Sequence, residues 1–139
     1  MKDKKKFIIF AHSGTYDKLY QTITLAITAA SMGKETYIFL FFWALKKFVN
    51  EEFDVIKLST EFGEEGLQLS KRMQELNPIS LKEILGEVRK MGNLKIYACT
   101  AAVKLMGLEE KTVKAKVDDI LGLTSILDIA SGADTQLFI

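Results

Sequence analysis

Cys99 is the side chain in this sequence whose type and position together suggest covalent chemistry. It is the only cysteine among 139 residues, and it follows a short apolar run, Leu94–Ala98, of the kind that forms a buried strand. Thr100–Met106 is predicted as a short helix because Gly107 stands where a helix commonly ends. A thiol at this strand-to-helix turn would lie at a helix N-terminus. The partial positive charge there favours the thiolate, which is the nucleophilic form of cysteine.

A buried and unreactive thiol is the alternative interpretation of Cys99. Free cysteines commonly pack as small hydrophobic side chains with no chemistry of their own. The single cysteine excludes an internal disulfide framework and a cysteine-rich zinc site, and the single histidine excludes a histidine-based metal cluster. We therefore expect no metal and no other cofactor.

Other candidate residues follow the predicted strands, because open α/β sheets bind ligands outside the carboxyl ends of their strands. His12, Ser13 and Gly14 follow the first strand, and Trp43 follows the second. If the first strand neighbours the strand of Cys99, an imidazolium at His12 would further favour the thiolate. The alternatives are a solvated or capping histidine and an aromatic side chain that simply ends a buried strand.

Two more candidates, Thr100 and Ala101, directly follow the cysteine and would offer backbone N–H groups to an anion. The turn formed by Ser13, Gly14 and Thr15 is also suited to a phosphate. However, the sequence contains neither the glycine-rich dinucleotide fingerprint nor the P-loop pattern, and their absence argues against those two kinds of site.

Composition limits the class of protein. The formal net charge is +1, with 48% hydrophobic and 27% charged residues, which is ordinary for a globular domain and gives no global field to attract nucleic acid. No apolar stretch approaches the roughly 18 residues of a transmembrane helix. The apolar run near the N-terminus is too short for a signal peptide. We expect a single domain over residues 1–139, located in the cytoplasm.

Apolar periodicity predicts strands that alternate with helices. The predicted strands are Lys6–Ala11, Thr36–Phe42, Leu94–Ala98 and Thr135–Ile139. The predicted helices are Tyr16–Met32, Ala44–Val49, Glu64–Leu76, a helix that starts at the capping box Ser80–Glu83, Thr100–Met106, and Asp118–Ser131 with Ile120, Leu123, Leu127 and Ala130 facing inward. Pro78 is expected to separate two of these helices. Residues Asn50–Phe62 are interpreted as irregular, with an edge strand over Phe53–Leu58 as the alternative.

This order predicts an α/β fold, with an open and mainly parallel sheet of four to five strands and helices on both faces, a flavodoxin-like three-layer sandwich. Several aromatic residues exceed what the helices of a small sheet need to cover, so we also expect a homo-oligomer with closed symmetry. These residues are Phe41, Phe42, Trp43, Phe48, Phe53 and Phe62.

Five stretches, taken in order, resemble the DsrE/DsrF-like superfamily, which includes TusD-type sulfur-relay proteins and the group often labelled peroxiredoxin-family DsrE. The stretches are HSGTYDK, LAITAASMGKE, YIFLFFWAL, YACTAAVKLMGL and LGLTSILDIASGADTQLFI. The resemblance implies that Cys99 accepts sulfane sulfur as a persulfide and passes it to a partner protein. It also implies sulfur donor or acceptor proteins as partners, and trimers or hexamers of this chain.

Two other functions are alternatives to the sulfurtransferase hypothesis. The chain could be a non-catalytic subunit that binds a small anion or nucleotide at the carboxyl edge of the sheet, or a purely structural oligomer. Because there is no second cysteine, an intramolecular resolving step is impossible, and peroxiredoxin chemistry is not expected.

Overall fold

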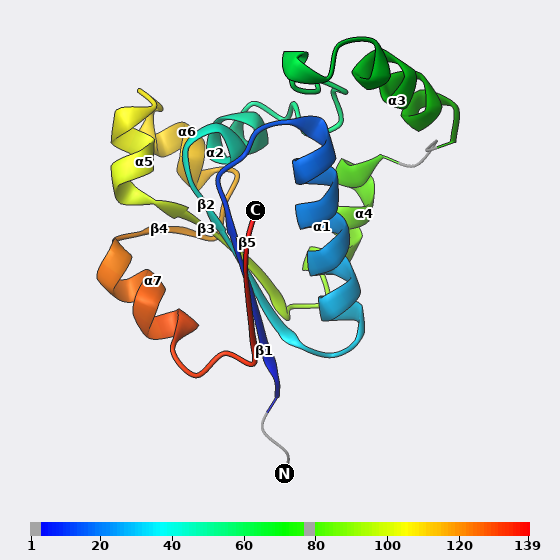
Figure 1. Ribbon diagram of the computed structural model, residues 1–139. Helices are drawn as coiled ribbons and strands as arrows, with labels where there is room; N and C mark the ends of the chain where they lie inside the picture. Colours follow the sequence, from blue (N-terminus) through cyan, green and yellow to red (C-terminus); the bar gives the residue numbers. More distant parts are fainter. Residues whose placement is uncertain (1–3, 77–79) are drawn as a thin grey trace.

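The fold is built on one open sheet of five parallel strands. The computed structural model describes residues 4–76 and 80–139, so the predicted break at Pro78 lies outside the described residues. The strands are β1 (Lys6–Ala11), β2 (Glu35–Leu40), β3 (Leu94–Cys99), β4 (Asp119–Leu121) and β5 (Thr135–Phe138), in the spatial order β4-β3-β2-β1-β5 (Figure 1). The predicted α/β class and open parallel sheet are confirmed.

Seven α-helices and one 3₁₀ helix are found in the described parts of the chain. They are α1 (Tyr16–Ser31), α2 (Phe42–Val49), η1 (Thr60–Phe62), α3 (Gly63–Leu76), α4 (Leu81–Arg89), α5 (Thr100–Leu105), α6 (Glu110–Lys114) and α7 (Leu123–Ala130). Helices α1 and α4 pack against one face of the sheet and against each other, and α7 lies on the opposite side (Figure 1). None of the described helices is long and apolar enough to cross a membrane.

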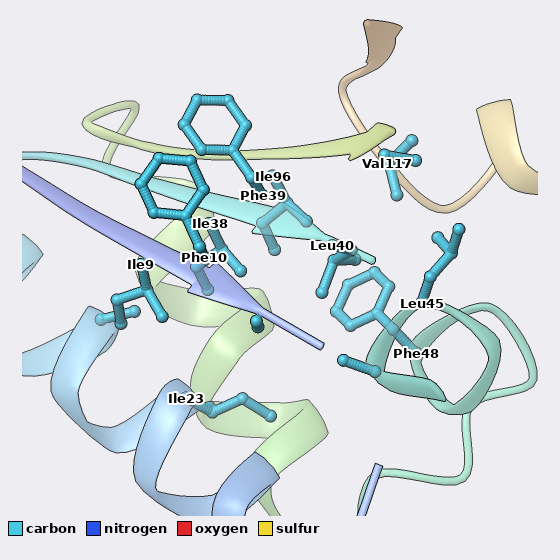
Figure 2. Packing of buried hydrophobic residues seen from close by; sticks show 14 of the residues in the cluster. Ile9, Phe10, Ile23, Ile38, Phe39, Leu40, Leu45, Phe48, Ile96 and Val117 are labelled. Carbon is cyan, nitrogen blue, oxygen red and sulfur yellow. The ribbon is translucent and has the colours of Figure 1, made fainter. Parts of the chain in front are cut away.

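The centre of the sheet is apolar on both faces because helices and loops cover both. Residues 7–11 of β1 are all buried, as expected for a central parallel strand. Figure 2 shows Ile9 facing Ile23 of α1, while Phe10 and Phe39 stand side by side on the other face of the sheet. Near the carboxyl ends of β2 and β3, Leu45 and Val117 close the core (Figure 2).

The second face of the sheet carries a row of aromatic side chains. Phe10 stacks on Phe138, with ring centroids 4.5 Å apart, and packs at a tilt against Phe39 at 5.5 Å, while Tyr97 stacks on Phe39 at 5.9 Å. Tyr37 extends the row and donates a hydrogen bond to Glu35. Burial raises the pKa of Tyr37, and burial together with the nearby Asp118 charge raises the pKa of Tyr97.

The segment between α2 and α3 has no strand, so the predicted irregular path is correct and the alternative edge strand is not formed. Two acidic side chains attach this segment to the body of the protein. Asp54 accepts hydrogen bonds from the Leu81 and Lys82 N–H groups, at 2.7 and 3.1 Å, and so caps α4. Glu51 forms ion pairs with Lys82 at 2.8 Å and Lys116 at 2.6 Å. The Ser80 hydroxyl also accepts a hydrogen bond from the Glu83 N–H, which is the N-cap half of the predicted capping box.

The predicted helix Asp118–Ser131 is wrong in its first half. Residues Asp119–Leu121 form β4, which pairs in parallel with β3, and the helix begins only at Leu123. The prediction that Leu123 and Leu127 face inward is also wrong, since these side chains are 56% and 63% exposed, whereas Ile126 is buried. The spacing of Ile120, Leu123 and Leu127 imitates a helical stripe although a strand and a helix share it.

Candidate functional site

The residues predicted to form a site lie at two separate places on the carboxyl edge of the sheet. The first is a cavity of about 330 Å³ that we call the lysine pocket. The second is the turn at Cys99, Thr100 and Ala101, which joins β3 to α5. The lysine pocket is lined by His12, Ser13, Gly14, Thr15, Lys18, Trp43, Lys47, Lys57 and Leu58.

Backbone hydrogen bonds hold the loop that forms the lysine pocket. The His12 N–H donates to the Ile139 carbonyl at 2.8 Å, and the His12 carbonyl accepts from the Ala44 N–H at 3.1 Å. The Tyr16 N–H at the start of α1 donates to the Lys57 carbonyl at 2.9 Å. These bonds join the ends of β1 and β5, the first turn of α2 and the irregular segment around one cavity.

Gly14 lets this loop lie directly against α2. A Cβ atom at Gly14 would stand 2.8 Å from the Trp43 Cβ and 3.0 Å from the Trp43 carbonyl oxygen, closer than side chains pack. The absence of a side chain at Gly14 therefore positions Trp43 at the rim of the lysine pocket, where its side chain is 60% exposed. Trp43, which the sequence suggests as a pocket-lining residue, is thus one of the residues around this cavity.

Cys99 occupies the strand-to-helix turn that the sequence predicts. It is the last residue of β3 and the N-cap residue of α5, with an extended backbone conformation, and its side chain makes no capping hydrogen bond. The residue pairs with Leu121 of β4 and is only 3% exposed, as part of the hydrophobic core. The placement at the helix start is confirmed, and the thiol is buried in this conformation of the chain.

His12 and Cys99 are not neighbours across the sheet. Strand β2 hydrogen-bonds to β1 on one side and to β3 on the other, so β1 and β3 are separated by a full strand. Two strand spacings place the strand ends about 10 Å apart. The condition under which His12 would tune the thiol is therefore not met, and His12 and Ser13 belong to the lysine pocket instead.

The two residues after Cys99 differ in their surroundings. Ala101 is exposed on α5, whereas Thr100 lines a small cavity of about 140 Å³ together with Lys104, Lys114 and Asp119. Lys114 is paired with Glu110 at 3.0 Å. This cavity lies beside the cysteine turn, but Cys99 itself does not line it.

Sequence reasoning missed the three lysines of the lysine pocket. Lys18 lies on the first turn of α1, Lys47 on α2 and Lys57 in the irregular segment, so no sequence spacing connects them. The feature that the three lysines share is their position around this cavity, at the carboxyl edge of the sheet. Among residues 4–76 and 80–139, no group of three or more His, Cys, Asp or Glu side chains is placed to hold a metal ion.

The chain is thus an open parallel α/β protein with a single thiol at the carboxyl end of β3. Comparison with known proteins agrees with the resemblance that the motifs carry. Residues 3–65 match the model of the DsrE/DsrF/DrsH-like family. This match covers β1, α1, β2 and α2, which include the loop of the lysine pocket.

Two further comparisons cover nearly the whole chain. The chain is 28% identical to the uncharacterized protein YrkE of Bacillus subtilis (strain 168), with 97% of each sequence covered. Its fold matches the crystal structure of the ychN protein from E. coli with a TM-score of 0.61 at 17% identity, covering 97% of this chain and 99% of that one. At this identity the second match supports the fold alone.

Proposed function

We propose that this protein is a cytoplasmic sulfur-relay protein that carries sulfane sulfur as a persulfide on Cys99. The observation that carries the proposal is the position of the sole thiol, at the carboxyl edge of the sheet and at the start of α5. Ligands of open α/β sheets bind at this edge. The match of residues 3–65 to the DsrE/DsrF/DrsH-like family model supports the sulfur-relay class, because sulfur relay is the activity that the resemblance implies. At Cys99 itself, the resemblance rests on the stretch YACTAAVKLMGL.

The proposed chemistry needs one nucleophile and no cofactor. The Cys99 thiolate attacks the outer sulfur of a donor persulfide, the sulfur–sulfur bond of the donor breaks, and the donor thiolate leaves with the electron pair. Cys99 then holds the persulfide. An acceptor thiolate attacks the outer sulfur of that persulfide in the same way and regenerates the Cys99 thiolate. Both steps are exchanges, so no oxidant or reductant is consumed.

Burial of Cys99 sets a requirement on this chemistry. With 3% of the residue exposed, a donor reaches the sulfur only after a local opening of the turn. Helix α5 is suited to such an opening because it has six residues and an exposed outer side that includes Ala101 and Leu105. Its inner residues Ala102 and Val103 pack against the body of the protein. A burial of this kind protects a persulfide from water until a partner binds.

Intact-mass spectrometry after incubation with inorganic polysulfide tests the proposal. The expected result is a gain of one sulfur atom, mapped to Cys99 by peptide analysis and released by dithiothreitol. Cys99→Ala is the control and should gain nothing. A wild-type chain that remains unmodified would instead favour a non-catalytic subunit in which Cys99 is a packing residue.

A further inference from the structure

The lysine pocket has an excess of positive charge that the fold does not neutralise. Of the three lysines that line it, only Lys47 has an acidic partner, Glu52, at 3.1 Å. Lys18 and Lys57 form no ion pair with any described residue, and none of the lining residues is acidic. The charges of Lys18 and Lys57 are thus left without an acidic partner among the described residues, and an anion bound in the pocket would neutralise them.

The backbone around the same cavity is also suited to an anion. Helix α1 has 16 residues and begins at the pocket, and its N-cap residue Thr15 makes no side-chain capping hydrogen bond. The partial positive charge of this helix start therefore adds to that of the lysines. The hydroxyl groups of Ser13 and Thr15 lie 3.4 Å apart at the pocket and supply additional hydrogen-bond donors.

The volume of the lysine pocket and the residues at its rim indicate which class of ligand would fit. About 330 Å³ lies at the lower end of the range for small-molecule pockets, which is about 300–1,000 Å³. Leu58 and the exposed ring of Trp43 give the rim an apolar side. A pocket of this size has room for a tetrahedral anionic group near the lysines and for a small attached group against Trp43.

We infer that the lysine pocket binds a small dianion with a tetrahedral oxyanion group, either an organic phosphate or thiosulfate. The inference rests on the three lysines together with the shape of the cavity, and it is independent of the role proposed for Cys99. The pocket and the cysteine lie at the ends of different strands with β2 between them. Binding should therefore persist in a chain that lacks the thiol.

Trp43 provides the measurement, because it is the only tryptophan in the chain and stands at the rim of the pocket. Its fluorescence is followed during titration with ribose 5-phosphate, inorganic phosphate and thiosulfate at constant ionic strength. Isothermal calorimetry on the same solutions covers a ligand that leaves the fluorescence unchanged. We expect saturable binding of at least one of these anions, which weakens as salt is added because the lysines are near the surface.

Substitutions distinguish anion binding in the lysine pocket from nonspecific attraction of anions to surface charge. Lys18→Gln and Lys57→Gln should each weaken binding by about tenfold, the effect of losing one charge-assisted hydrogen bond. Lys111→Gln, on exposed α6, removes the same charge elsewhere and should leave binding unchanged, as should Cys99→Ala. Preference for ribose 5-phosphate identifies an organic phosphate as the ligand class, and preference for thiosulfate identifies a sulfur compound. The inference is overturned if neither method detects binding, or if Lys111→Gln weakens it as much as Lys57→Gln.

Discussion

At the scale of single residues, the burial of Cys99 determines how its role is tested. A hydroxyl in place of the sulfur would need a hydrogen-bond partner in the core, so Cys99→Ser should lower the free energy of unfolding by about 1–3 kcal/mol. Stability is thus lost in this variant whether or not the thiol carries sulfur. Cys99→Ala avoids the unpaired hydroxyl and should cost about 1 kcal/mol. Denaturant unfolding measures the stability of both variants, and if both were as stable as the wild type, the side chain would not be packed in the core.

The backbone of Gly14 lies directly against Trp43 of α2, so adding a side chain at Gly14 should change stability. Gly14→Ala introduces a Cβ atom that must displace Trp43, which should destabilise the protein by about 1–3 kcal/mol and shift the tryptophan emission. Gly86→Ala is the matched control, because no atom lies within 4 Å of the added Cβ in α4. That change should stabilise the protein by about 0.5–1 kcal/mol through helix propensity. Unchanged stability and emission in Gly14→Ala would show that the loop does not press on Trp43.

At the scale of elements, Glu51 links the irregular segment to α4 and to the residues after α6. Hydrogen bonds from Lys116 and then Lys82 lower the pKa of Glu51 from its ordinary value of 4.5 to about 2. The carboxylate therefore stabilises the fold above pH 4.5, and this stabilisation is lost as the pH falls toward 2. Because the group is exposed, the effect is modest.

Melting curves between pH 7 and pH 2 test the role of Glu51. Glu51→Gln should melt at a lower temperature than the wild type at pH 7, and the difference should shrink below pH 4.5. Glu87→Gln removes an exposed pairing with Lys90 and serves as the control, with little change at any pH. A constant difference between Glu51→Gln and the wild type down to pH 2 would contradict the ion-pair explanation.

The elements also show what sequence patterns can and cannot predict. Strand β1 and the cap of α4 follow from local signals, a continuous apolar run and a capping box, and both are found at the predicted residues. Strand β4 has three residues and is fixed by distant groups, since the Asp118 carboxylate accepts the Ile96 N–H at 2.7 Å and pairs with Arg89 at 3.3 Å. Contacts of this kind leave no periodic signal in the sequence.

The candidate site was predictable to a similar extent. The position of Cys99 follows from an apolar run and a helix-ending glycine, both of which are local. The separation of His12 from Cys99 depends on strand order, which places β2 between their strands. The lysine pocket depends on three elements that approach each other only in the folded chain, so neither its lysines nor its charge could be read from spacing.

At the scale of the whole molecule, an incompletely covered apolar face supports the expected homo-oligomer. Leu123 and Leu127 of α7 and Phe138 of β5 are exposed, and Phe138 is 77% exposed although it stacks on Phe10. Among the aromatic residues that the sequence marks as excess, Phe48 and Phe53 are buried and stack on each other at 5.3 Å, whereas Phe42, Trp43 and Phe62 are exposed. A closed homo-oligomer would remove the remaining exposed surface from water.

Light scattering at low micromolar concentration tests this expectation. The wild-type chain should have a mass that is a multiple of 15.7 kDa, and Phe138→Asp should shift the population toward the single-chain mass by placing a charge in the apolar face. Met91→Asp, at an exposed position between α4 and β3, is the control and should leave the mass unchanged. A wild-type mass of 15.7 kDa would contradict the expected assembly.

The transfer of sulfur from a loaded chain tests the proposed relay most directly. The protein is treated with polysulfide, freed of excess reagent, and mixed with a small thiol acceptor while the intact mass is followed over time. The account predicts one sulfur atom per chain on Cys99, its loss to the acceptor, and a second round of loading on the regenerated thiolate. No loading of the native protein, or loading that persists in Cys99→Ala, would contradict a relay through this cysteine.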